Sequence, residues 1–305
     1  MKLTIRTKQK IKNNVVGYLY VMPVVLGVLI FTAFPVIYAF ISSFFETSLK
    51  PIGEGLDKFV WFDNYLQALT NSYYRRKFFK SLGVTFLYAG TYIPISLILS
   101  FLLAILLNQE LKGMRFYRVL YYLPVLIPAV CSGMLWNRIT DPYYGLINKA
   151  LENMGLEVLP WFTKAASSMP SFIFISMFTL GGSMILWLAQ LKNVPKTLYE
   201  SARLDGATKL RQLVSITVPI CTPMILYNVI MSIIGVMQTY SQVLTLVGDS
   251  GPEDSLLFYV FNIYDNRVSS FGYACALSFI LFAIIGALTA VVMKTSKWVY
   301  YTEEG

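Results

Sequence analysis

Six long uncharged stretches dominate the hydrophobic pattern of this chain. Runs without Asp, Glu, Lys or Arg cover residues 13–45, 81–109, 119–137, 165–191, 212–248 and 268–293. Crossing about 30 Å of hydrocarbon takes roughly 20 helical residues, and each run is close to that length or longer. Apolar and polar residues do not alternate within them, as they would in membrane β-strands. The pattern predicts an all-α integral membrane protein with spans at about 15–44, 81–107, 118–137, 170–191, 217–244 and 270–293.

Composition supports lipid as the solvent for most of the chain. Of 305 residues, 56% are hydrophobic and only 13% are charged. The first uncharged run has 33 residues, which is too long for the apolar core of a secretory signal, so we expect it to remain as a span. No polar block is long enough for a separate soluble domain of the usual size. We expect one transmembrane domain over residues 1–305.

The distribution of charge predicts an orientation. With both termini in the cytoplasm, the inside segments carry 15 basic and 5 acidic residues, and the outside segments carry 10 and 11. Because Lys and Arg favour the cytoplasmic side, this predicts an N-in, C-in topology. One basic cluster does not fit this topology, because it falls on the outside just before the second span. Its members are Arg75, Arg76, Lys77 and Lys80.

The loop between the fourth and fifth spans, residues 192–219, is the most informative segment. Thr197 followed by Glu200 has the spacing of a capping box, which predicts a helix beginning at Leu198. Gly206 can adopt the left-handed conformation that ends such a helix. A second helical stretch is expected from about Ala207 toward Pro219. Taken alone, this pattern is equally typical of an amphipathic helix lying at the membrane surface.

The spacing within this loop resembles the permease of binding-protein-dependent ABC importers. The pattern is E-A-A, three residues, G, nine residues, and I-x-L-P; here Glu200, Ser201 and Ala202 precede Gly206, and Ile216 and Pro219 follow at the matching distance. Ser201 and Val218 depart from it, each by a small change. The stretches GYLYVMPVVLGVLIFTAFPVIYAF and FYRVLYYLPVLIPAVCSGMLWNRITDPYYGLIN, with the Gly-Pro loop before LLFYVFNIYDNRVSSFGYACALS, are similar to the carbohydrate-uptake branch.

The resemblance implies an importer-type permease fold in which residues 196–218 form coupling helices that dock on a cytoplasmic ATPase. The implied partners are a second homologous permease, two ATPase subunits and an extracellular solute-binding protein, with ATP and Mg bound by the ATPases and no cofactor in this chain. A prokaryotic plasma membrane, import by alternating access and a sugar or oligosaccharide substrate are also implied. The residues expected to carry the coupling are Glu200, Ser201, Ala202, Arg203, Asp205, Gly206, Ala207, Ile216 and Pro219.

The fifth span carries the best candidate for a solute path. At 100° per residue, Asn228, Ser232, Gly235, Thr239 and Gln242 fall on one stripe, with Gln238 beside it. Tyr240 and Trp187 are candidate stacking residues. The stripe is more often a packing seam, because small and polar residues mediate helix association in lipid, and both roles can hold at a cavity between two permeases. With no charge inside any span, the path suits a neutral solute.

Other functions remain open at this stage. A polyol or a glycerol phosphate is an alternative solute, although an anion site should add basic residues within the spans. An ion-coupled secondary carrier should show intramembrane charges or inverted repeats. The chain has no histidine and three cysteines, so we expect no metal site, no catalytic residues and no nucleic-acid partner. It also lacks the G-x-x-x-x-G-K-[ST] phosphate loop, so ATP hydrolysis is expected in a separate subunit.

Overall fold

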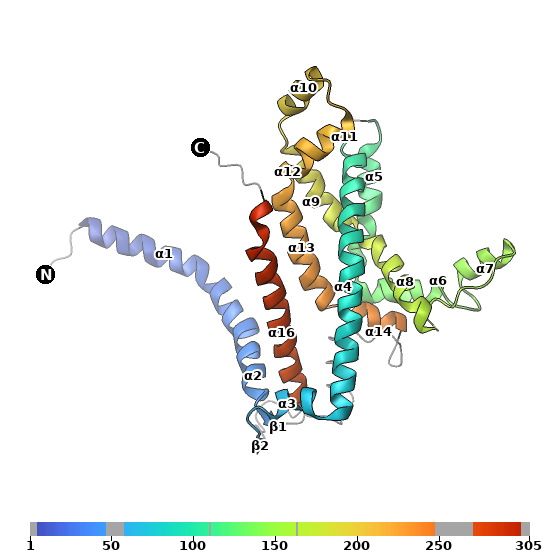
Figure 1. Ribbon diagram of the computed structural model, residues 1–305. Coiled ribbons are helices and arrows are strands. Elements are labelled where there is room, and N and C mark those ends of the chain that lie inside the picture. Colours follow the sequence, from blue (N-terminus) through green and yellow to red (C-terminus); the bar gives the residue numbers. More distant parts are fainter. Residues whose placement is uncertain (1–4, 47–57, 110, 163, 248–270, 300–305) are drawn as a thin grey trace. The chain divides into compact units, whose positions relative to one another are not determined.

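The computed structural model describes residues 5–46, 58–109, 111–162, 164–247 and 271–299, and the chain divides into two compact units (Figure 1). The first unit comprises residues 1–71 and 263–279, and the second comprises residues 72–262 and 280–305. Apart from one short hairpin, the described segments with regular structure are helical. Short 3₁₀ and π segments are labelled η.

The first unit begins with a long apolar helix. Its elements are α1 (Ile5–Val28), the π segment η1 (Leu29–Ala33), α2 (Phe34–Ser42), β1 (Phe45–Glu46), β2 (Lys58–Phe59) and α3 (Asp63–Thr70). The strands β1 and β2 pair antiparallel, with Phe45 opposite Phe59. The buried Asn64 amide donates to the carbonyls of Ser43 and Phe45 at 2.9 and 3.0 Å, which fixes α3 against the end of α2.

The second unit is built around one long helix. Its elements are α4 (Ser72–Leu107), α5 (Met114–Tyr122), η2 (Leu123–Leu126), α6 (Ala129–Ile139), α7 (Leu146–Asn153), α8 (Ala165–Ser176), η3 (Met177–Thr179), α9 (Gly181–Lys192), α10 (Lys196–Leu204), α11 (Lys209–Gln212), η4 (Leu213–Thr217), α12 (Val218–Ile220), α13 (Thr222–Met237) and α14 (Ser241–Val247). Helix α16 (Phe271–Lys294) begins in the first unit and continues in the second, before η6 (Ser296–Trp298). Helix α4 packs against α9 and α13, and α14 packs against α6 (Figure 1).

Three helical stretches are long and apolar enough to cross a membrane without interruption. They are Val16–Ser42, Ser72–Leu107 and Phe271–Lys294, and they overlap the first, second and sixth predicted spans. The second begins nine residues before the predicted residue 81, so the basic cluster from Arg75 to Lys80 lies in its first turns. Residue 270, where the sixth span was expected to begin, lies outside the described residues. Counting each bent helix pair described next as one span raises the number of spans to six.

The third, fourth and fifth predicted spans are bent where the sequence pattern shows one apolar run. The bends are 98° between Met114–Leu126 and Ala129–Ile139, 47° between Ser167–Thr179 and Gly181–Lys192, and 66° between Lys209–Ile220 and Thr222–Met237. Proline explains the sharpest bend, because Ile127 before Pro128 is extended, as the proline ring requires. The expectation of one helix over 217–244 was wrong, since α13 ends at Met237.

The core of the second unit lies where α4, α9 and α12 meet. Its buried members are Ala104, Leu107, Met184, Trp187, Leu188, Leu191, Val194 and Cys221. The indole Nε1 of Trp187 donates to Ser100 Oγ on α4 at 3.1 Å, which satisfies both buried polar groups. Gln190 on α9 donates to the carbonyl of Ile220 at 3.1 Å and secures α12 to the same core. Elements that pack in this core also position the two sites described below.

Candidate functional site

A groove of about 390 Å³, here called the α13 groove, runs between α4, the α8–α9 segment and α13. None of the described residues that line it carries a charge. Three tyrosine rings and seven side chains with hydroxyl or amide groups contribute to its walls. They are Tyr88, Tyr92 and Tyr227, together with Ser176, Thr179, Ser183, Asn228, Ser232, Thr239 and Gln242.

The groove brings together the five residues of the predicted stripe. Asn228, Ser232 and Gly235 lie on α13, and Thr239 and Gln242 line the same groove although the helix ends before them. Within this chain, the stripe therefore faces a groove. Asn228 is the deepest of the five, with 2% of its surface exposed, and its amide donates to the carbonyl of Met224 at 2.9 Å.

The other three path candidates lie elsewhere. Gln238 is the C-terminal cap of α13 and is exposed, and it does not line the groove. Tyr240 lies in the link between α13 and α14 and is not among the lining residues either. Trp187 is 1% exposed, with its ring against Phe101 and its indole bonded to Ser100. Its stacking role is not supported, because an apolar ring in a membrane bundle more often packs than binds.

The groove also contains residues that the sequence analysis missed. Tyr88 and Tyr92 lie one turn apart on α4, and their rings stack with centroids 5.1 Å apart. Ser176, Thr179 and Ser183 follow at helical spacing through the bend between α8 and α9. The same search for polar stripes, applied to the second and fourth spans, would have found them.

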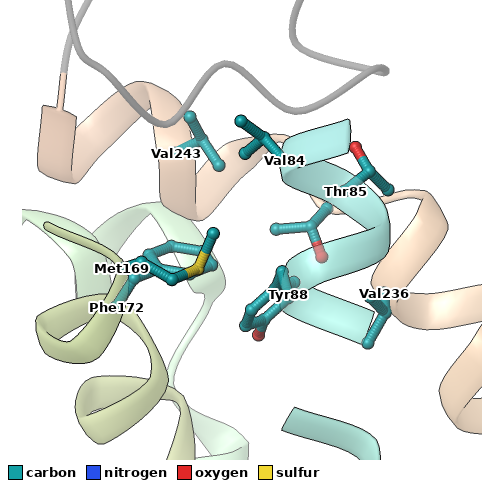
Figure 2. Close-up of a pocket in the computed structure, with 8 residues that line it drawn as sticks. Val84, Thr85, Tyr88, Met169, Phe172, Val236 and Val243 are labelled. Atoms are coloured by element: carbon teal, nitrogen blue, oxygen red, sulfur yellow. The ribbon is translucent and has the colours of Figure 1, made fainter. Parts of the chain in front are cut away.

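Tyr88 separates the groove from a small apolar cavity. Its hydroxyl donates to Ser176 Oγ at 3.0 Å, and its ring meets Phe172 edge to face at 4.9 Å. Figure 2 shows Tyr88 on α4 facing Met169 and Phe172 on α8 across this cavity. The cavity has a volume of about 10 Å³, at most enough for a single water molecule. The groove is therefore closed on this side by packed side chains.

The second candidate site is the coupling segment, defined as residues 196–218. Helix α10 runs from Lys196 to Leu204, and Leu204 is 90% exposed. Of the nine α10 residues, only Tyr199 and Ala202 are half-buried, and the others are exposed. Arg203 and Glu200 are thus on the accessible surface, as are Ser201 and Asp205. Ile216 packs against the core, and Pro219 lies in the first turn of α12.

The predicted start of α10 was wrong. Pro195, in an extended conformation, is the N-cap, and no side chain caps the helix there. The helix begins at Lys196 and not at Leu198, so Thr197 and Glu200 lie within it and do not form a capping box. The ring of Pro195 fixes the backbone φ where the chain enters α10, so the helix begins there without the side-chain cap expected from Thr197.

The predicted turn after α10 is confirmed. Gly206 has φ +74°, and the amide of Ala207 donates to the carbonyl of Ala202 at 2.9 Å, which is the geometry of a glycine-terminated helix. The next helix starts two residues later than expected, at Lys209, because Thr208 caps it through the amide of Arg211. Buried Gln212 donates to the carbonyl of Ala207 at 2.8 Å and holds the turn.

Together these features bound the chemistry of the molecule. Flat rings and neutral hydrogen-bonding groups can hold an uncharged polar molecule in the α13 groove. Within the described parts of the chain, no three His, Cys, Asp or Glu side chains gather in a way that could hold a metal ion. Helix α10 presents both charges and an apolar side chain on an exposed surface, as a docking element does.

The comparisons with known proteins decide the family. The model of the family described as "Binding-protein-dependent transport system inner membrane component" matches residues 66–296. The chain belongs to this family. It is therefore a multi-pass membrane permease and not a catalytic enzyme.

Relatives that match nearly the whole chain support the same family. The "Probable ABC transporter permease protein YesP" of Bacillus subtilis is 32% identical, covering 95% of this chain and 93% of the relative. The "Trehalose/maltose transport system permease protein MalF" of Thermococcus litoralis is 28% identical, covering 98% and 99%. A solved bacterial ABC transporter "involved in the import of the acidic polysaccharide alginate" has a TM-score of 0.83 at 20% identity, covering 97% of this chain and 100% of that one. At that identity, the structural likeness establishes the permease fold.

Proposed function

We propose that this permease is one half of the translocation pathway of an ATP-driven importer of neutral sugars or oligosaccharides. The observation that carries this proposal is the α13 groove. Sugars present hydroxyl groups that need donors and acceptors, and apolar ring faces that stack on aromatic side chains. Tyr88, Tyr92 and Tyr227 supply rings, while Asn228 and Gln242 supply amides that donate and accept.

The lack of charge among the described groove-lining residues narrows the class of solute. An anionic saccharide or a glycerol phosphate would leave its charge unpaired in a low-dielectric site, which is costly. The solved relative imports acidic alginate, whereas the groove-lining residues here are neutral. The trehalose and maltose named for the archaeal relative are neutral disaccharides, and they illustrate the class that fits.

The proposed topology has six spans with both termini in the cytoplasm of a prokaryotic cell. It counts each bent helix pair as one span and follows the excess of Lys and Arg in the segments taken as internal. This arrangement puts the coupling segment on the cytoplasmic side, where an ATPase can reach it. It is also the arrangement in which a solute-binding protein delivers sugar from outside.

In the proposed complex, α10 docks on a cytoplasmic ATPase. Its exposed residues Glu200, Arg203 and Leu204 offer both signs of charge and an apolar contact. Two ATPase subunits bind ATP and Mg, and a second permease completes the pathway. Closure of the ATPases on ATP then moves α10 and opens the groove to one side of the membrane at a time.

The test uses the complete complex, purified with its co-expressed partners and reconstituted in liposomes. ATP hydrolysis is measured with the solute-binding protein loaded from a panel of neutral oligosaccharides, polyols, glycerol phosphate and an acidic saccharide. The proposal predicts stimulation and uptake with one or more neutral sugars. Stimulation by the phosphate or the acidic saccharide alone would refute the solute class. A chain that retains no ATPase would refute the importer proposal itself.

A further inference from the structure

The structure shows how α10 is attached to the rest of the permease. Tyr199 and Ala202 are the only α10 residues that are not exposed, and Tyr199 bonds to Thr217 at the start of the fifth span. Its hydroxyl and Thr217 Oγ1 lie 2.8 Å apart and share a hydrogen bond. Its ring packs against the core that contains Leu191 and Trp187.

Two open spaces border the side chain of Tyr199. Tyr199 borders a cavity of about 390 Å³ and a second cavity of about 710 Å³. Both are lined by Tyr199 together with Asn108 and Leu191. Tyr199 therefore contributes to the walls of both cavities, and its side chain is called the strut of α10 below.

Thr217 lies where the π segment η4 meets the helix α12. It is the last residue of the π segment η4, it is buried, and α12 follows at once. The helical axis turns by 66° between Lys209–Ile220 and Thr222–Met237. A π segment breaks the regular hydrogen-bond ladder and is a place where a helix can yield. A force on α10 that reaches Thr217 is thus applied next to the bend.

The bend leads directly to the α13 groove. Helix α13 has 16 residues and carries Asn228, Ser232 and Gly235 along its length. Asn228 lies six residues after the first residue of α13, which is about 9 Å at 1.5 Å per residue. Because an α-helix moves as a rigid rod over this length, displacement at its first turn shifts the groove-lining side chains.

We infer that Tyr199 is a positioning residue that transmits movement of the coupling segment to the α13 groove through its hydrogen bond to Thr217. The inference rests on the proposed function, in which α10 docks on the ATPase. The route runs from α10 through Tyr199 to Thr217, then past the bend into α13. It assigns the phenol hydroxyl a role in coupling, in addition to the packing role of the ring.

The test compares Tyr199→Phe with wild type in the reconstituted complex. The variant keeps the ring in the core and removes only the hydroxyl, so assembly with the partners and basal ATP hydrolysis should persist. The measured quantity is solute imported per ATP hydrolysed, which a purely structural residue would not change in a complex that assembles normally. We expect this ratio to fall about five-fold, as the loss of one hydrogen bond implies.

Thr217→Val probes the same bond from the other side and serves if Tyr199→Phe fails to assemble. Thr217→Val also removes the bond from Thr217 Oγ1 to the carbonyl of Gln212, so we expect at least the same fall. The double variant should fall no further than Thr217→Val alone, because the shared bond is already lost. Tyr117→Phe is the matched control, since that tyrosine lies on α5 with 49% of its surface exposed. It should retain the wild-type ratio.

Two outcomes would overturn the inference, and they are distinguishable. If wild type couples hydrolysis to uptake and both Tyr199→Phe and Thr217→Val keep the same ratio, the strut carries no signal and the proposed function stands. If wild type itself shows no stimulation by any loaded binding protein, the proposed function fails and the inference fails with it.

Discussion

The hydroxyl of Tyr88 donates to Ser176 Oγ at 3.0 Å, and this bond ties α4 to α8 where the groove meets the small apolar cavity. The hydroxyl of Ser176 in turn donates to the carbonyl of Phe172 at 2.8 Å, so the hydrogen bonds continue into α8. The ring of Tyr88 also stacks on Tyr92. One wall of the groove is therefore held by a continuous set of hydrogen bonds and ring contacts.

Replacing Tyr88 by Phe tests this wall. The ring contacts with Tyr92 and Phe172 remain, and Ser176 keeps its bond to the backbone, so the loss is one buried hydrogen bond worth about 1 kcal/mol. We expect a decrease of a few degrees in the melting temperature of the purified complex. A melting temperature equal to that of wild type would show that the bond adds no net stability.

The two glutamines near the end of α13 provide a matched pair for the solute path. Gln242 lines the groove, whereas Gln238 is exposed and does not. Gln242→Leu removes a donor and an acceptor from the groove and should lower the uptake rate of a neutral sugar about five- to ten-fold, which corresponds to about 1 kcal/mol. Gln238→Leu should leave uptake unchanged. Equal losses in the two variants would remove the groove from the path.

Close packing of α6 on α14 depends on a glycine. An added Cβ at Gly133 would overlap Thr245 Oγ1, and Asn137 on the same helix donates to the carbonyls of Thr245 and Leu246. Gly133→Ala should therefore push the helices apart and destabilise the protein by about 1–3 kcal/mol, seen as a lower melting temperature. Gly286→Ala is the control, because nothing lies within 4 Å of its added Cβ. It should be neutral or slightly stabilising.

The loop after α6 should respond to acid. The amides of Tyr144 and Tyr143 each donate to Asp141 Oδ1 at 2.9 Å, and these bonds, with the nearby Arg138 charge, lower the pKa of the carboxyl. A lowered folded-state pKa means that this contribution is complete above the carboxyl's ordinary pKa. It is lost as the pH falls through the lowered value. The protection of the two tyrosine amides against hydrogen exchange, relative to their intrinsic exchange rates, should fall over that acidic range, and Asp141→Asn should show no such fall.

Gly206 provides a test of the coupling segment with a second glycine as control. Gly206 and Gly155 have nearly the same conformation, with φ +74° and +73°, and no atom lies within 4 Å of an added Cβ at either. Alanine costs about 1–2 kcal/mol of backbone strain at both positions. Gly206→Ala should weaken stimulation of ATP hydrolysis by the loaded binding protein, whereas Gly155→Ala should not. Equal effects would argue against a special role for the turn after α10.

The apolar runs were enough to predict the three uninterrupted apolar helices Val16–Ser42, Ser72–Leu107 and Phe271–Lys294, because length and hydrophobicity determine what a bilayer accepts. They could not reveal the bends. Pro128 and Pro219 were visible in the sequence, yet proline occurs both in kinked and in broken membrane helices, and the surrounding packing decides between them. The extra turns of α4 before residue 81 were missed because Arg75 and its basic neighbours suggested a loop.

Local chemistry was predictable where one residue decides the backbone, and less so where several positions compete. Gly206 ends α10 as expected, because few other residues tolerate a positive φ. The N-cap of α10 is Pro195 and not Thr197, because the proline ring fixes the backbone two residues before the threonine. Helical spacing found Asn228 and Gln242, but Tyr88 lies on another span, and only the fold brings it to the same groove.

The most direct test of the solute path modifies the groove itself. Ser232 is placed on the groove, so Ser232→Cys, in a Cys131→Ser background that removes the exposed native thiol, is treated with a bulky maleimide in the reconstituted complex. Gln238→Cys is the control off the groove. We predict that complete modification of Ser232→Cys stops sugar uptake and that transported sugar slows the modification, with neither effect at position 238. Full uptake after complete modification at position 232 would contradict passage of the sugar through the α13 groove.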